Sequence, residues 1–370
     1  MPKVPGAPEV PEVPNILLVR LRLIGDVVFT TPAIGAIRRR FPGARNSYLV
    51  EAPAEPVVHH HPGIDEIIVL ERPRGLARLQ YDLALARRLR GGRFDLVIDF
   101  HGGPRSGFLT WATRARQRVG YDLPGRGWWY TTRVAWTRSL VPPRHSVLNQ
   151  WALVEPLGIE PPDRARDAVT MPLDPDAVRR VDDRLEAAGV DRSARLIVLH
   201  VSAGNPFRRW PATSFASAAA TLASEDPARR IIITSGPSEH AAAEAVAAEA
   251  RQLAGGAAAR IVRTGEFDLA ELRALVDRAA LYIGGDSGPL HIAATTRTPI
   301  VALFGPTLPE RSMPWRQPSR AIAVDGGPLP CRPCHQRHCV PGDFRCLTAL
   351  SPERVLVAAR ELLARENEPQ

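Results

Sequence analysis

Short runs of consecutive apolar residues alternate with stretches of helical periodicity along most of the chain. The apolar runs that predict buried strands lie at residues 15–20, 46–50, 65–70, 94–99, 196–201, 230–234, 281–284 and 299–304. Helices are predicted at residues 27–40, 81–90, 106–114, 176–188, 213–223, 238–253, 269–279, 290–295 and 351–367. Strands that are apolar throughout and alternate with helices are typical of a parallel sheet with helices on both faces. The predicted fold class is therefore α/β.

This alternation stops once and then restarts. Residues 161–175 are rich in Pro, Asp and Arg and show little periodicity. A chain of 370 residues suggests two domains at about 150 residues each. We expect two Rossmann-like domains facing a central cleft, residues 15–165 and 166–350, after a disordered Pro-rich tail at residues 1–14. Ligands of such sheets bind where the strands end, so the residues that follow each strand are the candidates for chemistry.

The chain is strongly basic. Its net charge is +9 and its pI is about 10.2, almost entirely from arginine, because Lys3 is its only lysine. A basic chain favours acidic partners such as nucleic acid, an anionic membrane surface or phosphorylated small molecules, although solvated Arg-rich faces explain the charge equally well. The basic residues are scattered and no nucleic-acid motif is present, so no nucleic-acid partner is expected.

Hydropathy predicts a cytoplasmic protein. No window reaches the roughly 18 uncharged apolar residues that a membrane span needs, and the N-terminus lacks the basic and apolar regions of a secretory signal. The basic segments at residues 38–40 and 87–90 face anionic lipid or a phosphorylated acceptor, or else only solvent. Four aromatic residues either line an acceptor or membrane surface or pack in the core: Trp128, Trp129, Tyr130 and Trp136.

Gly25 and Asp26 form a turn directly after the first predicted strand. A carboxylate there is suited to remove the proton from an attacking hydroxyl, as a general base. Asp is equally favoured as the N-cap of the helix that follows. The two interpretations stay open on these residues alone.

The segment at residues 204–211 follows the first strand of the second half and contains Arg208, Arg209 and Trp210. Small residues let backbone N–H groups approach a phosphate, and two arginines can balance its charge. The alternative is a basic loop in which the tryptophan is a packing anchor.

The segment from Asp286 to His291 lies between a strand and a helix and is the strongest candidate. Ser287 and Gly288 supply a hydroxyl and backbone N–H groups at a helix start, which suits a diphosphate; the alternative is an ordinary N-cap followed by a buried histidine. Glu239 follows another strand and either binds ribose hydroxyls or begins a helix as an exposed residue. No Walker or dinucleotide-binding pattern is present, and no cofactor is expected.

All four cysteines of the chain lie close together near its C-terminal end. Cys331, Cys334, Cys339 and Cys346 have two, four and six residues between them. Such a cluster either holds a structural metal or forms a reduced loop. The spacing leaves both possibilities open, and no catalytic metal is expected.

In their order along the chain, these segments resemble the ADP-heptose:lipopolysaccharide heptosyltransferases, glycosyltransferase family 9. The resemblance covers about residues 15–363. It is carried by residues 19–32, 94–99, 208–211, 285–294 and 331–355.

The resemblance implies a GT-B fold and an inverting transfer of heptose from ADP-heptose to a hydroxyl of the lipid A–core acceptor. No metal is required if arginine, histidine and the helix dipole neutralise the phosphates. A cytoplasmic enzyme of this kind could also contact the inner face of the anionic inner membrane peripherally. Another nucleotide sugar or another cell-envelope acceptor is the alternative. It also implies that Asp26 is the catalytic base, and that a C-terminal helix within residues 351–370 crosses back to the first domain.

On the donor side, the resemblance implies a binding site for the nucleotide diphosphate and the ribose. Arg208 occupies the position where the family commonly has Lys, so the positive charge is kept on a side chain of different shape. Ser202 lies in the family's small-residue turn, and Glu239 lies where a ribose-binding acid is expected. The residues implied to hold the diphosphate are Asp286, Ser287, Gly288 and His291.

Overall fold

The computed structural model describes residues 10–136, 142–334 and 336–366. The chain divides into two compact units, Met1–Pro172 and Leu173–Gln370. This division falls in the Pro- and Arg-rich stretch, a few residues after the predicted boundary. Within the described ranges, no helix is long and apolar enough to cross a membrane.

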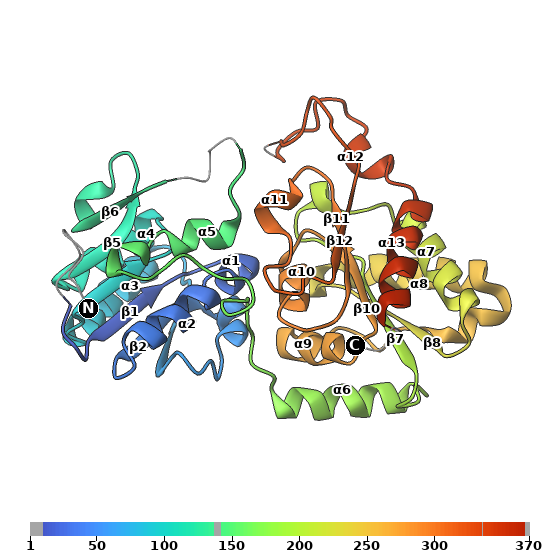
Figure 1. Ribbon diagram of the computed structural model, residues 1–370, viewed down its shortest axis with the longest axis horizontal. Coiled ribbons are helices and arrows are strands. Elements are labelled where there is room, and N and C mark those ends of the chain that lie inside the picture. Colours follow the sequence, from blue (N-terminus) through green and yellow to red (C-terminus); the bar gives the residue numbers. More distant parts are fainter. Residues whose placement is uncertain (1–9, 137–141, 335, 367–370) are drawn as a thin grey trace. The chain divides into compact units, whose positions relative to one another are not determined.

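The described part of the first unit forms a six-stranded sheet in the order β3-β2-β1-β4-β5-β6 (Figure 1), and each pair of neighbours is parallel. Its strands are β1 Asn15–Val19, β2 Arg45–Glu51, β3 Glu66–Leu70, β4 Leu96–Asp99, β5 Gln117–Asp122 and β6 Thr132–Ala135. Its α-helices are α1 Ile24–Val28, α2 Thr31–Arg40, α3 Leu76–Gly91, α4 Pro104–Ala112 and α5 Ser146–Trp151, with 3-10 turns η1 Ala52–Val57, η2 Gly127–Trp129 and η3 Glu155–Leu157. The order reverses between β1 and β4, as in a doubly wound sheet.

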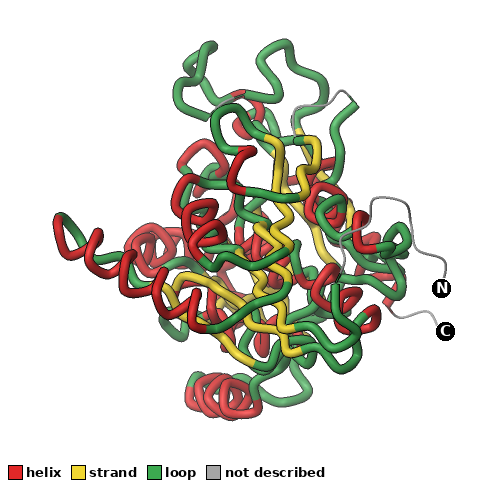
Figure 2. The backbone as a smooth tube through the Cα atoms, turned by 90° about the vertical axis from the view of Figure 1, so that its left-hand side faces the viewer, coloured by secondary structure: helices red, strands yellow, loops and turns green. Residues whose placement is uncertain are grey.

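Helices cover both faces of this sheet (Figure 2). On one face, Leu17 and Val19 of β1 lie in a buried cluster with Leu89 of α3 and Leu109 of α4. On the other face, Tyr48 of β2 shares a hydrogen bond of 2.8 Å with the Thr30 hydroxyl at the start of α2. Because both faces of the sheet are buried, strands such as β1 appear in the sequence as continuous apolar runs.

The second unit repeats the same topology among its described residues, in the order β12-β11-β10-β7-β8-β9, again with parallel neighbours. Its strands are β7 Arg195–His200, β8 Arg229–Thr234, β9 Ile261–Val262, β10 Leu281–Gly285, β11 Ile300–Phe304 and β12 Ala321–Asp325. Its α-helices are α6 Pro175–Ala187, α7 Ala212–Glu225, α8 His240–Ala254, α9 Leu269–Asp277, α10 Gly288–Ala293, α11 Pro309–Ser312, α12 Arg345–Thr348 and α13 Pro352–Glu366; its 3-10 turns are η4 Pro206–Arg208, η5 Pro237–Glu239 and η6 Gly255–Arg260. Here the order reverses between β7 and β10.

Helix α13 differs from its expected placement. Its apolar side chains, including Val355, Ala359 and Leu362, lie in the buried cluster that α7, α8 and the strands of the second sheet share. The described part of this helix therefore covers the second unit's own sheet instead of crossing back to the first domain. The predicted tail at residues 1–14 is described only from residue 10, and residues 10–14 contain no helix or strand.

The single helix predicted at residues 27–40 is two helices, α1 and α2. Pro32 has no N–H and its ring clashes with the preceding turn of a continuous helix, so it stands in the first turn of α2 instead. The hydroxyls of Thr30 and Thr31 donate to the last two carbonyls of α1, at 2.7 and 2.8 Å, and satisfy groups that the break leaves open.

Strands β5, β6, β9 and β12 were not predicted. Strand β5 reads Gln-Arg-Val-Gly-Tyr-Asp and lacks an apolar run. Gly120 stands in its middle because Tyr130 packs against the backbone there: a Cβ at this position would lie 2.3 Å from the tyrosine ring. Such strands are stabilised by tertiary packing and carry a weak local signal.

Candidate active site

The predicted site residues of each unit gather where its strand order reverses. In the first unit, Asp26 lies in the short helix α1 that follows β1, and His101 lies in the loop after β4. In the second, the loops after β7 and β10 carry Arg208 and Asp286. The carboxyl ends of strands at such a reversal are the usual ligand-binding position of an open parallel sheet.

Asp26 lies inside helix α1, whose N-cap is Leu23. The predicted alternative of an N-cap role is therefore wrong, and the carboxylate instead forms an ion pair with Arg20. Arg20 is buried, and its Nη1 donates to the carbonyl oxygen of Phe100, after β4, at 2.5 Å. This arginine ties the ends of β1 and β4 together and orients Asp26, and its positive charge favours the ionised carboxylate.

His101 lies beside this ion pair and was not singled out from the sequence. Burial, together with the positive charges of Arg20 and Arg22, lowers the pKa of His101 to about 4. The imidazole is therefore neutral at pH 7. Its Nδ1 is buried with no hydrogen-bond partner among the described residues, so it is available to a ligand. The sequence feature that could have identified His101 is the motif Asp-Phe-His-Gly-Gly at the end of a buried strand.

Asp99 holds the loop that carries His101. One carboxylate oxygen accepts hydrogen bonds from the backbone N–H groups of His101 and Gly102, at 2.9 and 3.0 Å, and the other accepts from the Tyr130 hydroxyl at 2.7 Å. Burial raises the pKa of Asp99. Because its oxygens are used inside the unit, Asp99 shapes the loop and is not a candidate for contact with a ligand.

In the second unit, Asp286 organises the two basic residues of the predicted phosphate site. Arg208 Nη1 donates to its carbonyl oxygen at 2.9 Å and lies 3.3 Å from its carboxylate, and His291 Nε2 lies 3.5 Å from the other carboxylate oxygen. Burial raises the pKa of Asp286, but the hydrogen bond and charge of His291 and the charge of Arg208 outweigh it and bring the pKa to about 2. The ionised Asp286 thus holds the Arg208 and His291 side chains in place.

Ser287 is the N-cap of α10, but its hydroxyl makes no capping bond. This oxygen is buried and has no hydrogen-bond partner among the described residues. The first N–H groups of a helix also lack partners within it. Gly288 opens the helix, and Gly285 before it lets the Arg208 turn approach, because a Cβ there would lie 2.9 Å from the Arg208 carbonyl oxygen. Open donors beside a held arginine suit an anion.

Ser202 and Glu239 are both engaged within the second unit. The Ser202 hydroxyl lies 3.0 Å from His200 Nε2 and accepts from the Gly236 N–H at 2.8 Å, which joins the ends of β7 and β8. Glu239 pairs with Arg209 at 2.5 Å, and its side chain is only 9% exposed. Glu239 is therefore not the exposed helix-start residue that its alternative interpretation described.

Trp210 is a buried anchor, whose Nε1 donates to the Leu350 carbonyl at 2.8 Å. This contact accords with the alternative interpretation of the tryptophan. It ties the turn that carries Arg208 to the residues before α13. The anchor and the arginine's role are compatible, because the two side chains point to different partners.

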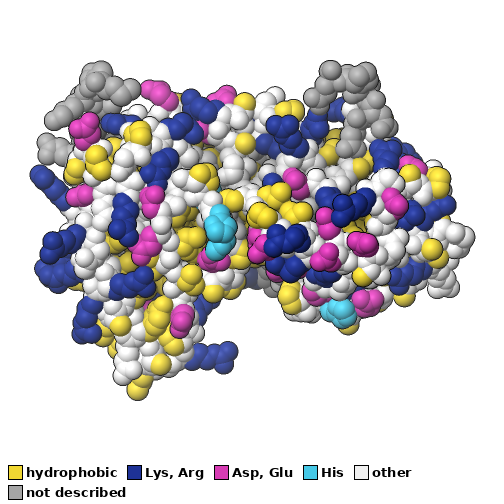
Figure 3. Space-filling model, turned by 90° about the horizontal axis from the view of Figure 1, so that it is seen from below, with side chains coloured by type: hydrophobic (Ala, Val, Ile, Leu, Met, Phe, Trp, Pro, Cys, Tyr) yellow, Lys and Arg dark blue, Asp and Glu magenta, His cyan; other side chains and the backbone are white. Residues whose placement is uncertain are grey.

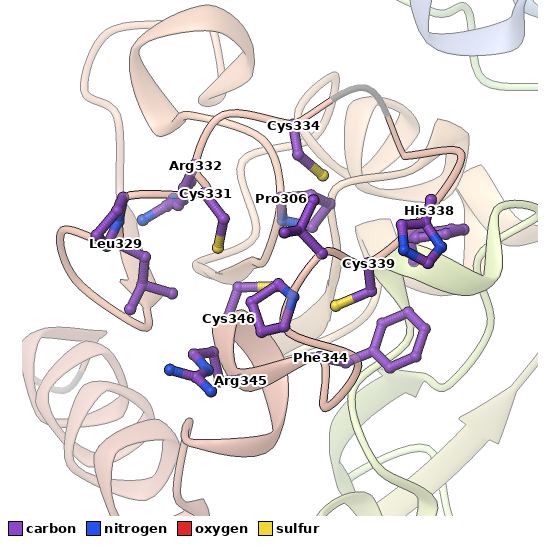
Figure 4. Close-up of a pocket in the computed structure, with 14 residues that line it drawn as sticks. Pro306, Leu329, Cys331, Arg332, Cys334, His338, Cys339, Phe344, Arg345 and Cys346 are labelled. Carbon is purple, nitrogen blue, oxygen red and sulfur yellow. The ribbon is translucent and has the colours of Figure 1, made fainter.

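The four cysteines line one cavity of about 510 Å3, together with Phe207 and Phe344 (Figure 4). All four are free thiols, and burial together with the other three thiols raises the pKa of Cys346. In the part of the chain that is described, no three His, Cys, Asp or Glu side chains are arranged to hold a metal ion.

The cysteine loop contacts the phosphate-site arginine through Gln336. The Oε1 of Gln336 accepts from Arg208 Nε at 2.7 Å and from Asn205 Nδ2 at 2.9 Å. Arg208 is thus held on one side by Asp286 and on the other by this loop. Sequence reasoning missed Gln336, because nothing in the local pattern connects it with a residue so far away in the chain.

Two Rossmann-like units of this topology are characteristic of the GT-B fold. The same fold is found in a glycosyltransferase family 9 protein from Veillonella parvula, with a TM-score of 0.82 at 23% identity over 97% of this chain and 99% of that one. It is also found in ADP-heptose lipopolysaccharide heptosyltransferase II of Escherichia coli, with a TM-score of 0.75 at 19% identity over 96% of this chain and 100% of that one.

Residues 83–343 match glycosyltransferase family 9 (heptosyltransferase), and the chain belongs to this family. Lipopolysaccharide heptosyltransferase 3 of Escherichia coli K12 is 27% identical over 352 residues, which cover 93% of this chain and 96% of that protein. Lipopolysaccharide heptosyltransferase 1 of Pseudomonas aeruginosa is 25% identical and covers 94% of this chain and 98% of that protein. The predicted family, fold class and enzyme class are thereby confirmed.

Proposed function

We propose that this enzyme transfers heptose from ADP-heptose to a hydroxyl of the lipopolysaccharide inner core, with inversion at the anomeric carbon and with Asp26 as the general base. The observation that carries the proposal is the Asp26 carboxylate, held by the buried Arg20 where the strand order of the first sheet reverses. Membership of the heptosyltransferase family supports the donor and the acceptor class.

On the acceptor side, Asp26 accepts the proton as the hydroxyl oxygen attacks the anomeric carbon. The new bond to the acceptor oxygen forms while the bond from the anomeric carbon to the phosphate oxygen breaks, and ADP leaves with the bonding electrons. Arg20 keeps the carboxylate ionised and oriented for this transfer. His101, neutral and with an open Nδ1, is placed to accept a hydrogen bond from a sugar hydroxyl.

On the donor side, the second unit binds ADP-heptose. Arg208 and His291 offset the charge that grows on the leaving diphosphate, and the Ser287 hydroxyl and the first N–H groups of α10 donate to its oxygens. Fixed donors of this kind act most strongly when water is excluded. The protein's own cations and donors supply this stabilisation in the proposal, which therefore needs no metal.

The test is a transfer assay with ADP-heptose and heptose-deficient lipopolysaccharide. Asp26→Asn keeps the shape of the side chain but cannot take a proton, and we expect the transfer rate to fall by about 10²- to 10⁴-fold, the usual range for a lost general base. The affinity for ADP should stay unchanged. Asp183→Asn, which alters an exposed carboxylate without an ion pair among the described residues, is the matched control.

A rate for Asp26→Asn that equals the wild-type rate would exclude Asp26 as the base. Retention of configuration in the product, determined by NMR of the new glycosidic bond, would exclude the single displacement. No transfer by the wild type would exclude this donor–acceptor pair. The alternative of another nucleotide sugar or another envelope glycan would then be tested with those donors and acceptors in the same assay.

A further inference from the structure

Helix α3 of the first unit is apolar on two opposite sides. Its inner side buries Leu85, Ala86 and Leu89 in the core. Its outer side carries Leu76 and Leu79, which are 82% and 60% exposed, and Leu83, which is 41% exposed. These three leucines are three and four residues apart and so share one side of the helix. A surface helix of a globular protein normally has a single apolar side.

The neighbouring helix α4 also carries an exposed apolar side chain. Helices α3 and α4 cover the same face of the sheet and are joined by an ion pair of 2.5 Å between Asp82 and Arg105. Trp111 of α4 and Trp128 of η2 meet edge to face at 6.0 Å, and they are 41% and 62% exposed. We call the set Leu76, Leu79, Leu83, Trp111 and Trp128 the α3–α4 surface.

The α3–α4 surface is accompanied by unpaired positive charge. Arg87 and Arg90 continue the outer side of α3, Arg74 precedes the helix, and all three are exposed without an ion pair among the described residues. No acidic residue lies in the outer row of α3. The face of the first unit seen in Figure 3 likewise carries hydrophobic and basic side chains side by side.

Most of the other predicted lipid-facing groups are engaged within the unit. In the basic segment at residues 38–40, Arg38 pairs with Asp65 at 2.5 Å, Arg39 pairs with Asp167, and the exposed Arg40 lies over the ring of Phe41. Of the four predicted aromatic residues, Tyr130 is buried, and Trp129 and Trp136 are partly covered. Only Trp128 of the four is exposed in the described part of the chain, and it belongs to the α3–α4 surface.

We propose that the α3–α4 surface docks the enzyme on an anionic lipid bilayer. The leucines and tryptophans enter the headgroup region, where tryptophan is favoured, and the arginines reach the lipid phosphates from the end of the same row. A second copy of the chain fits less well, because a twofold contact through this row would bring unpaired arginines of both copies together.

This docking rests on the proposed function in one respect: an enzyme docked on the bilayer would meet its lipid-anchored acceptor at the membrane in which that acceptor is embedded. The binding itself needs neither donor nor acceptor. Failure to bind lipid and failure to transfer heptose can therefore be distinguished.

The test is flotation of the full chain with vesicles of phosphatidylcholine alone or mixed with phosphatidylglycerol. We expect binding to the mixed vesicles only, and weaker binding at high salt. Leu79→Asp should lower the bound fraction at least about tenfold, because it places a negative charge in the apolar row beside anionic lipid. Leu253→Asp, at a leucine of the second unit that is 58% exposed, is the matched control and should bind like the wild type.

Circular dichroism and ADP affinity show whether each variant keeps its fold. The proposal is overturned if the wild type ignores the mixed vesicles, if it binds both kinds equally, or if Leu79→Asp binds like Leu253→Asp. It is also overturned if sedimentation velocity finds a dimer that Leu79→Asp dissociates while the wild type leaves vesicles unbound, because the surface would then join two copies.

Discussion

The ionised carboxylate of Asp286 should stabilise the second unit against unfolding, and the shift of its pKa gives the size of this contribution. The pKa falls from its ordinary value of 3.8 to about 2 because His291 and Arg208 outweigh the effect of burial. One pKa unit corresponds to about 1.4 kcal/mol, so the ionised form contributes on the order of 2 kcal/mol to the free energy of unfolding at pH 7. Asp286→Asn removes this charge and leaves a side chain of the same shape.

A lowered carboxyl pKa contributes stability above the unfolded value, and this contribution is lost as the pH falls through the folded value. We therefore expect Asp286→Asn to lower the free energy of unfolding of the second unit by about 2 kcal/mol at pH 7. The difference from the wild type should stay constant down to about pH 5 and shrink below about pH 4. Urea unfolding followed by circular dichroism at each pH measures it.

The matched control is Asp183→Asn in the same unit, an exposed carboxylate without an ion pair in the described ranges. It should unfold like the wild type at every pH. The assignment of Asp286 as an ionised, stabilising partner of Arg208 and His291 would be refuted in two cases: if Asp286→Asn unfolds like the wild type at pH 7, or if the difference in the free energy of unfolding grows as the pH falls.

Three further predictions concern other contacts. Arg20→Met should lower the transfer rate about tenfold or more at unchanged ADP affinity, because Asp26 loses the group that orients it; an unchanged rate in the transfer assay would contradict this. Gln336→Ala should weaken ADP binding by about fivefold to tenfold in calorimetry, because the charged Arg208 loses the amide oxygen that accepts its hydrogen bond. A loss of thermal stability without loss of affinity would indicate a structural role alone. Gly120→Ala should cost about 1–3 kcal/mol in urea unfolding, because the new methyl group overlaps a buried tyrosine ring, and wild-type stability would show that the ring moves away at no cost.

Local sequence signals were sufficient for the repeated α/β pattern. The strands at residues 94–99 and 196–201 are apolar throughout because helices cover both of their faces, and this leaves a readable run. The same reasoning explains why Asp26, Arg208 and Asp286 were found, since each directly follows such a strand or its turn. Membership of family 9 was likewise visible in the order of these segments.

Only the tertiary structure decided what these residues contact. Arg208 and Asp286 are 78 positions apart in the chain, and Gln336 and His101 reach the sites from loops with no local signature. Helix α3 shows the limit most clearly, because its periodicity presents two apolar sides and the sequence cannot say which one is buried. Secondary structure depends on neighbours a few residues away, whereas ion pairs, burial and exposed surfaces depend on which distant segments the fold brings together.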